Sequence, residues 1–174
     1  MAPSIIVPNR SVNGVRIPTV GYGTMLFPEP ERAAELIQGA LECGYRHIDT
    51  ARKYGSEEWV GAGIRASGLA RKDIWVTTKV TEENAKADDF KRSVDTSLKT
   101  MGLDYVDLLL IHWPQPKVPL EETLDALAQA KKDGLAKNIG VSNFTVALLD
   151  EAVAKCAEPL LTNQIEYHAY IRQD

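Results

Sequence analysis

Apolar and polar residues follow one another along the chain in a repeating order. Short apolar runs predict strands, and longer stretches in which apolar residues recur every three to four positions predict helices. The predicted strands are 19–22, 47–49, 74–79, 105–111, 136–141 and 161–165, and the predicted helices are 31–43, 57–67, 88–100, 120–132 and 146–156. Successive strands begin roughly 25 to 31 residues apart, which is about the length of one strand and one crossover helix.

The strict alternation of strands and helices favours a parallel sheet covered by helices. The run 105–111 supports this arrangement because its apolar residues do not alternate with polar ones, as expected for a strand buried on both faces. Gly44 and Gly134 follow two of the predicted helices, where glycine suits the left-handed conformation that often ends a helix.

A β-hairpin is predicted ahead of this pattern. Two short apolar runs, Ile5–Val7 and Val15–Ile17, lie on either side of Asn13-Gly14. Because Asn-Gly favours the tight turns that join antiparallel strands, the N-terminal segment is expected to form a hairpin outside the repeating units.

Two architectures contain such an alternation: an open doubly wound sheet and a (β/α)8 TIM barrel. The open sheet binds dinucleotides through a glycine fingerprint directly after a strand. Gly21-Tyr22-Gly23 begins such a fingerprint, but Leu26 occupies the third glycine position. A second match at Gly61–Ala66 lies inside a predicted helix and is interpreted as coincidental. The predicted fold class is therefore α/β, of the TIM-barrel type.

The chain is shorter than the barrel that it predicts. Six strands are predicted in 174 residues, whereas a barrel of eight strand–helix units typically needs about 250 residues. An open sheet of six strands would leave two apolar edges exposed, which favours aggregation. We therefore expect residues 1–174 to form a single, C-terminally incomplete TIM-barrel domain. The alternative is that another molecule completes the barrel.

Composition and charge narrow the possible partners. Hydrophobic residues make up 44% of the chain and charged residues 25%, as in a soluble globular protein. The net charge of −4 does not favour nucleic acid or an anionic membrane, and no apolar run approaches the roughly 20 residues of a membrane span. The N-terminus has no secretory signal pattern, and Cys43 and Cys156 are interpreted as thiols buried in helices. These features predict that the protein is located in the cytoplasm.

Polar residues stand at or just after the carboxyl ends of the predicted strands. They are Asp49, Lys79, His112, Ser142, Asn143, Asn163, Gln164 and Glu166. In a parallel barrel these ends lie on one rim, where barrel enzymes form their active sites. Each residue has a structural explanation of its own, such as a turn for Asp49, but together they favour one site. A buried Lys79 would also need a partner, which Asp49 on the neighbouring strand can supply.

These residues resemble the motifs of the aldo-keto reductase family. The family's Asp-Thr-Ala-x-x-Tyr motif matches IDTARKYG at Asp49 and Tyr54, its lysine matches Lys79 in VTTKV, and its histidine matches His112 in LLLIHWP. Further matches follow in order at Gly21–Thr24, Ile139–Phe144 and Asn163–His168. The resemblance spans essentially the whole chain, and within the family the sequence is similar to bacterial reductases of 2,5-diketo-D-gluconate and methylglyoxal.

The resemblance implies NADPH-dependent reduction of an aldehyde or ketone, including dicarbonyls such as methylglyoxal, to the alcohol. It implies that Tyr54 is the general acid, that Lys79 stabilises the phenolate left behind, and that Asp49 holds Lys79 in place. His112 would orient the carbonyl oxygen, and Trp113 would form an apolar wall of the substrate site. The expected partner is a small-molecule carbonyl, and the complete protein is expected to be a monomer.

The same resemblance implies a cofactor site. Its residues are Gly23, Thr24, Asp49, Ser142, Asn143 and Gln164, of which the last three match the positions that hold the nicotinamide carboxamide. In the family, residues beyond the point that corresponds to Asp174 supply a stacking aromatic, basic residues around the adenosine phosphate, and a substrate loop. We therefore expect the 174-residue chain alone to be inactive or very weak.

Three other functions stay open from the sequence. A cofactor-binding module of the same fold would not need an acid, and this argues against it. An inactive fragment that needs a missing part or a partner is compatible with the length. A metal-dependent hydrolase would use Asp49, His112, Glu166 and His168, but Lys79 would compete with the metal, so no metal site is predicted.

Overall fold

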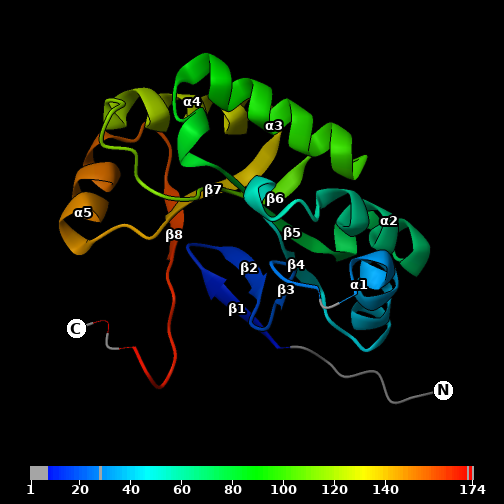
Figure 1. Cartoon of the computed structure of the whole chain (residues 1–174). Helices are drawn as coiled ribbons and strands as arrows, with labels where there is room; N and C mark the ends of the chain where they lie inside the picture. The colour runs from blue at the N-terminus through cyan, green and yellow to red at the C-terminus, as the bar shows by residue number, and fades with distance from the viewer. Residues whose placement is uncertain (1–7, 28, 172, 174) are drawn as a thin grey trace.

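A parallel sheet forms the centre of the computed structural model, which describes residues 8–27, 29–171 and 173 (Figure 1). Its strands lie in chain order from β3 to β8. Their bounds are Tyr22–Gly23, His47–Asp49, Trp75–Val80, Val106–Ile111, Ala136–Ser142 and Leu160–Gln164. A parallel sheet in chain order is what successive strand–helix units produce, so the predicted α/β architecture is confirmed.

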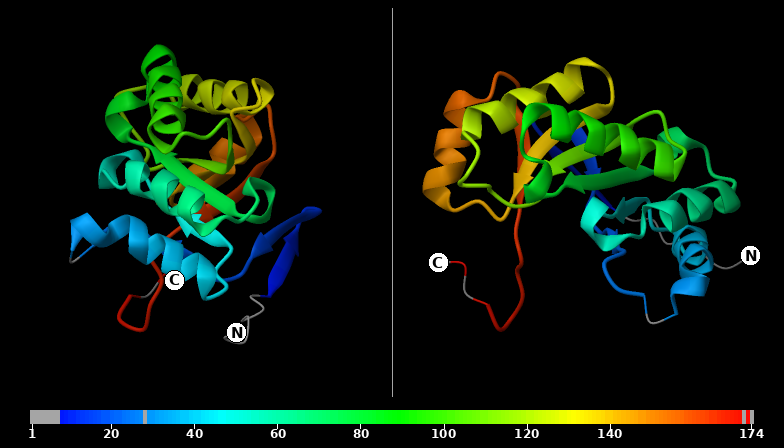
Figure 2. Two further views of the ribbon diagram at one scale, coloured as in Figure 1. Left: turned by 90° about the vertical axis from the view of Figure 1, so that its right-hand side faces the viewer. Right: turned by 45° about the horizontal axis from the view of Figure 1, so that its top comes forward.

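Within the described residues, five α-helices lie on the outer side of the curved sheet (Figures 1 and 2). They are α1 Ala33–Glu42, α2 Glu57–Ser67, α3 Ala87–Met101, α4 Leu120–Lys132 and α5 Val146–Lys155. Short 3-10 helices occupy the connections: η1 Pro30–Arg32, η2 Arg52–Tyr54, η3 Arg71–Asp73 and η4 Glu82–Asn84. The predicted helices are confirmed, and the bounds of α2 and α4 agree with the prediction at both ends.

The N-terminal hairpin is also present. Strands β1 (Asn9–Val12) and β2 (Val15–Pro18) pair antiparallel around the predicted Asn13-Gly14 turn, and both turn residues have positive φ angles. The predicted strand at Ile5–Val7 lies outside the described residues.

The first strand of the parallel sheet is the least accurate part of the prediction. The run 19–22 was expected to form it, but only Tyr22 and Gly23 pair with the next strand. Thr19 instead extends the hairpin, because its N–H and its hydroxyl both donate to the carbonyl oxygen of Pro8, at 2.9 Å and 2.8 Å.

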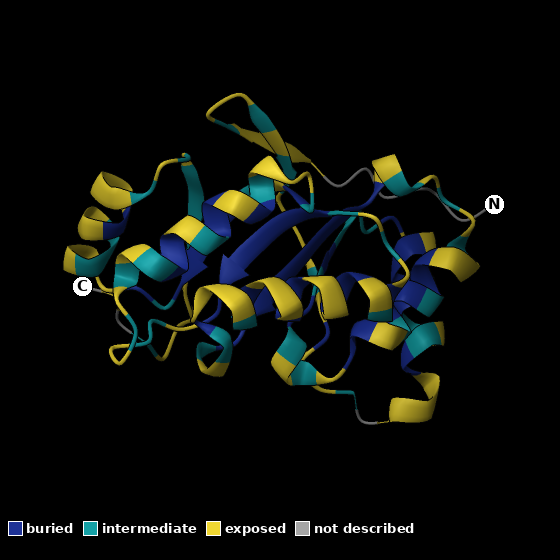
Figure 3. Cartoon of the chain, turned by 90° about the horizontal axis from the view of Figure 1, so that it is seen from above, coloured by how far each residue is buried: buried dark blue, intermediate teal, exposed yellow. Residues whose placement is uncertain are grey.

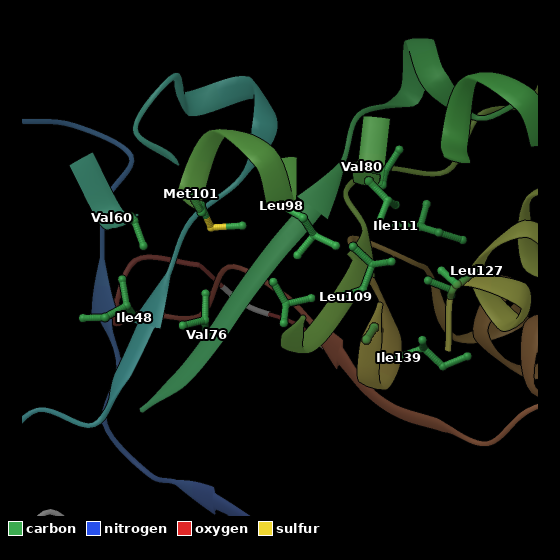
Figure 4. Close-up of a cluster of buried hydrophobic side chains, with 14 of the residues drawn as sticks. Ile48, Val60, Val76, Val80, Leu98, Met101, Leu109, Ile111, Leu127 and Ile139 are labelled. Atoms are coloured by element: carbon green, nitrogen blue, oxygen red, sulfur yellow. The ribbon is translucent and has the colours of Figure 1, made fainter. Parts of the chain in front are cut away.

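The main hydrophobic core lies between the sheet and the helices. Figure 3 shows buried strands beneath helices whose outer faces are exposed. In Figure 4, Ile48, Val76 and Leu109 of three strands point toward Met101 and other helix residues. A smaller cluster on the other face of the sheet joins Trp75, Leu108 and Leu110 to Val15, Ile17 and Leu161, so β2 packs there.

Close packing explains the glycines of α2. A Cβ atom on Gly61 would lie 1.9 Å from the carbonyl oxygen of Met101, and one on Gly63 would lie 2.7 Å from Cβ of Ile37. These glycines therefore let α2 approach α3 and α1. Gly61–Ala66 lies inside the helix, which confirms that it is not a dinucleotide fingerprint.

The interpretation of the cysteines was wrong in part. Cys43 is exposed and Cys156 is half-buried, because both lie one residue beyond the ends of their helices. In the part of the chain that the structure describes, no helix is both long enough and apolar enough to cross a membrane.

Candidate active site

The carboxyl ends of the parallel strands bring the predicted residues to one rim. Asp49 ends β4, Lys79 lies in β5, and Ser142 and Gln164 end β7 and β8. His112 directly follows β6 and remains in register with β5 because its N–H donates to the carbonyl oxygen of Val80 at 2.9 Å. Tyr54 comes from η2, which follows β4.

The ammonium of Lys79 is the centre of the site. The side chain is only 1% exposed, and its Nζ donates to Oδ1 of Asp49 at 2.6 Å and to the carbonyl oxygen of Thr50 at 2.9 Å. It also lies 3.4 Å from Oη of Tyr54. Asp49 is therefore the partner that the sequence led us to expect for a buried lysine, and Tyr54 is its third polar contact.

Asp49 is held from two sides. Its Oδ1 accepts from Lys79, while its Oδ2 accepts from Nε2 of Gln164 at 2.8 Å. These two partners come from β5 and β8, so the carboxylate connects strands that are distant in the sequence. With both oxygens bonded, Asp49 is suited to hold the ammonium of Lys79 in place.

His112 is buried beside Tyr54. The two rings are in edge-to-face contact, with centroids 5.5 Å apart and planes at 79°. Burial, followed by the nearby charge of Lys79, lowers the pKa of His112 below its ordinary value of 6.5. The imidazole is therefore neutral near pH 7, and its buried Nδ1 has no hydrogen-bond partner in the described residues.

The amide and hydroxyl groups of the rim bind one another in this structure. Nδ2 of Asn143 donates to the carbonyl oxygen of His112 at 2.9 Å and to Oγ of Ser142 at 3.1 Å. The Ser142 hydroxyl donates to the carbonyl oxygen of Gln164 at 2.8 Å. Asn143 has a φ angle of 63°, a left-handed conformation that asparagine tolerates better than most residues. These bonds hold the ends of β6, β7 and β8 together.

Thr24 occupies a buried position behind the rim. Its hydroxyl lies 3.0 Å from the carbonyl oxygen of Asp49 and 2.9 Å from Oγ of Ser56, which in turn lies 2.9 Å from Oγ1 of Thr50. Thr24 thus holds the backbone of Asp49 through a hydrogen bond. Gly23, at the end of β3, is exposed.

Other predicted residues lie farther out. Trp113 is 48% exposed. Glu166 and His168 lie beyond β8 in an exposed segment, where His168 Nε2 and Glu166 Oε1 are 2.9 Å apart. Among the described residues, no group of three or more His, Cys, Asp or Glu side chains is arranged to hold a metal ion.

Sequence reasoning missed the polar residues beneath Tyr54. Ser56 and Glu57 are buried; Ser56 bonds Thr24 and Thr50, which directly follow β3 and β4, and Glu57 bonds Thr78 of β5. The available signal was their place directly after the tyrosine motif and before a helix, where serine and glutamate also act as ordinary helix-start residues.

Comparison with known proteins places these residues in a family. The sequence matches the aldo/keto reductase family over residues 19–174. Methylglyoxal reductase DkgB of Escherichia coli O157:H7 is 44% identical over 159 residues, which cover 90% of this chain and 59% of that protein. Glyoxal reductase of Bacillus subtilis (strain 168) is 40% identical over 161 residues, which cover 92% of this chain and 58% of that protein.

Solved structures show the same similarity. A putative 2,5-diketo-D-gluconic acid reductase B superposes with a TM-score of 0.92 at 41% identity, covering 97% of this chain and 59% of that chain. The Bombyx mori aldo-keto reductase in complex with NADP gives a TM-score of 0.87 at 35% identity, covering 94% of this chain and 59% of that one. The TIM-barrel fold predicted from the sequence is thereby confirmed, and the chain spans about 59% of the length of these relatives.

Proposed function

The chain belongs to the aldo/keto reductase family, and from this membership we propose that its function is NADPH-dependent reduction of an aldehyde or ketone to the alcohol. The observation that carries the proposal is the position of Lys79, bonded to Asp49 and 3.4 Å from the hydroxyl of Tyr54. Because relatives are named methylglyoxal reductase and glyoxal reductase, small dicarbonyls are the substrates to test first.

Tyr54 acts as the general acid in this proposal. When the carbonyl carbon is reduced, negative charge develops on its oxygen, and a nearby hydroxyl can donate the proton that neutralises it. The ammonium of Lys79 favours the phenolate that remains on Tyr54 after this transfer. Asp49 keeps that ammonium in place through the bond of 2.6 Å.

His112 orients the substrate oxygen. A neutral imidazole has one donor and one acceptor nitrogen, and the low pKa of His112 keeps it in this form near neutral pH. Its ring lies against that of Tyr54, and this contact supports the proposal that both groups bind the same carbonyl oxygen. Trp113, with its exposed side chain, forms the apolar wall of the substrate site.

The rim fits a nicotinamide cofactor by the chemistry of its donors. Ser142, Asn143 and Gln164 present a hydroxyl and two amides beside Asp49, and amides pair well with a carboxamide, which also donates and accepts. When bound, the cofactor supplies the hydride that reduces the carbonyl carbon. Nδ2 of Asn143 already donates two hydrogen bonds within the chain, so Asn143 would hold the carboxamide by exchanging a partner or through its acceptor oxygen. Nε2 of Gln164 donates one hydrogen to Asp49 and has a second hydrogen to offer.

Gly23 ends β3 and pairs with Asp49, and Thr24 directly follows it and binds the Asp49 carbonyl oxygen; we propose that both help to present Asp49 to the cofactor. The neighbour solved with NADP supports NADP(H) as the cofactor. A cytoplasmic location fits the unpaired thiols Cys43 and Cys156, because disulfides persist mainly in oxidising compartments. The monomeric state stays a prediction, which light scattering after size-exclusion chromatography would test.

The proposal is tested by following NADPH oxidation with methylglyoxal, glyoxal and simple aldehydes. The 174-residue chain alone is expected to turn over far below the median enzyme rate of about 10 s⁻¹, and a longer form that contains it is expected to approach that rate. Turnover near that rate by the 174-residue chain would contradict our view of what the remaining part supplies. No carbonyl-dependent NADPH oxidation by the longer form would contradict the proposed function itself.

A further inference from the structure

Glu57 is a buried carboxylate that the proposed reaction does not use. It is the first residue of α2 and is only 1% exposed. Burying a carboxylate costs several kcal/mol unless charged or polar partners compensate for the lost water. Its position in the first turn of a helix recovers only part of this cost, so its partners indicate what it does.

Its two oxygens bind two different elements. Oε1 accepts from the hydroxyl of Thr78 at 2.8 Å, and Oε2 accepts from Nη1 of Arg52 at 3.2 Å. Thr78 lies in β5 and Arg52 begins η2. A single carboxylate therefore links a strand to a short helix that would otherwise meet it through fewer polar contacts.

These two elements carry the groups that must meet in the reaction. Thr78 directly precedes Lys79 in β5, and Arg52 lies in the same three-residue helix as Tyr54. The distance from Lys79 Nζ to Tyr54 Oη is 3.4 Å, which is near the upper limit for a hydrogen bond. A small movement of η2 away from β5 would therefore separate the ammonium from the phenol.

We infer that Glu57 is a positioning residue that sets the separation of Tyr54 and Lys79 by binding Arg52 and Thr78 together. This role rests on the proposed function, since it matters to catalysis only if Tyr54 is the acid. In reactions that depend on such geometry, a displacement of about 1 Å can reduce the rate by about 100-fold.

The sharpest variants change one atom group of the link at a time. Thr78→Val removes the hydroxyl that Glu57 binds and keeps the shape of the side chain, whereas Thr78→Ser keeps the hydroxyl. Arg52→Gln removes the charge at the other end and provides a second variant at a less buried site. Glu58→Gln is the matched control, because Glu58 stands in the same first turn of α2 but is exposed.

The primary measurement is the NMR spectrum of the 174-residue chain labelled with ¹³C at its six tyrosines, with the Tyr54 signal assigned by Tyr54→Phe. Thr78→Val and Arg52→Gln are expected to shift the Tyr54 signal and leave the other five in place. Thr78→Ser and Glu58→Gln are expected to leave all signals unchanged. This measurement needs no turnover, so it separates the positioning role from the proposed function.

In a form that turns over, Thr78→Val is expected to lower kcat by about 10- to 100-fold while KM changes by less than about twofold, because ground-state binding is retained. An unchanged Tyr54 signal in both Thr78→Val and Arg52→Gln would overturn the inference. A uniform change of every tyrosine signal would also overturn it, because it would show a general structural role for Glu57. A selective shift of Tyr54 without any carbonyl reduction would support the link and count against the proposed reaction.

Discussion

Lys79 illustrates how single residues determine the site. Its ammonium is almost completely removed from water and yet bonds Asp49, the backbone of Thr50 and Tyr54. Burying a charge in that position costs desolvation free energy, and an apolar residue of similar size would often stabilise the fold as well or better. In the proposed reaction, this ammonium stabilises the phenolate that forms on Tyr54 beside it.

We expect the ion pair of Lys79 and Asp49 to contribute to the free energy of unfolding. Asp49→Asn leaves the buried Lys79 without its counter-charge and is expected to lower the free energy of unfolding by about 3 kcal/mol. Urea unfolding of the variant and the wild type measures this difference. Lys91→Gln, which breaks an exposed ion pair with Asp95, is the control and is expected to have little effect. An Asp49→Asn variant as stable as the wild type would contradict the account of Lys79.

Two histidines, the buried His112 and the half-buried His47, predict how the free energy of unfolding depends on pH. Burial lowers the pKa of both His112 and His47 below 6.5, so the unfolded chain binds protons more readily than the folded one. Their contribution to stability is present above a pH of about 6.5 and is lost as the pH falls below it. Thermal unfolding between about pH 8 and pH 5 should show this loss. His112→Gln should make the dependence shallower, and an unaltered dependence would contradict the burial argument.

The site could be predicted from the sequence only in part. Asp49, Lys79 and His112 follow from the rule that the carboxyl ends of parallel strands meet at one rim. Tyr54 does not end a strand, and only its motif indicated it. The bonds of Glu57 to Arg52 and Thr78 depend on how η2 packs against β5, and periodicity contains no information on such packing.

At the scale of elements, helices were predicted more accurately than the first strand. Amphipathic spacing is repeated over many residues in a helix, whereas β3 has only two residues. Thr19, where the strand was expected to begin, instead bonds Pro8 and so belongs to the hairpin. The close contact of α2 with α3 was also invisible in the sequence. In the sequence, Gly61 indicates only a residue that disfavours helices, although the close approach of Met101 leaves no room for a Cβ atom there.

Two glycine variants test this distinction. Gly61→Ala places a Cβ atom 1.9 Å from the carbonyl oxygen of Met101. This variant is expected to lower the free energy of unfolding by about 1 to 3 kcal/mol. Gly39→Ala in α1 meets nothing within 4 Å and is expected to stabilise it by up to about 1 kcal/mol, because alanine favours helices. Chemical denaturation of both variants checks the signs. A Gly61→Ala variant as stable as the wild type would contradict the packing described for α2.

At the scale of the whole molecule, the sheet is open. In the described residues β8 pairs with β7 on one side, and all of its residues are partly exposed, while β6 is buried throughout. The chain spans about 59% of the length of its relatives. We still propose that residues 1–174 form a single domain of the barrel type.

Hydrogen exchange tests the open edge. Amides of β6 are expected to exchange at the slowest rates in the chain, and those of β8 are expected to exchange much faster, because edge strands open at lower free energy. Mass spectrometry after digestion resolves the two strands. Equal protection of β8 and β6 would show that another molecule, or a second copy of the chain, covers that edge.

We propose above all that Tyr54 is the acid of a carbonyl reduction, supported by Lys79 and His112. Its most direct test is the rate of NADPH-dependent methylglyoxal reduction by Tyr54→Phe and by the wild type, in the shortest form that turns over. Phenylalanine keeps the ring and its contact with His112 but has no proton to give. We expect kcat to fall by at least about 100-fold with the fold unchanged by circular dichroism. A Tyr54→Phe variant that retains the wild-type rate would contradict the assignment.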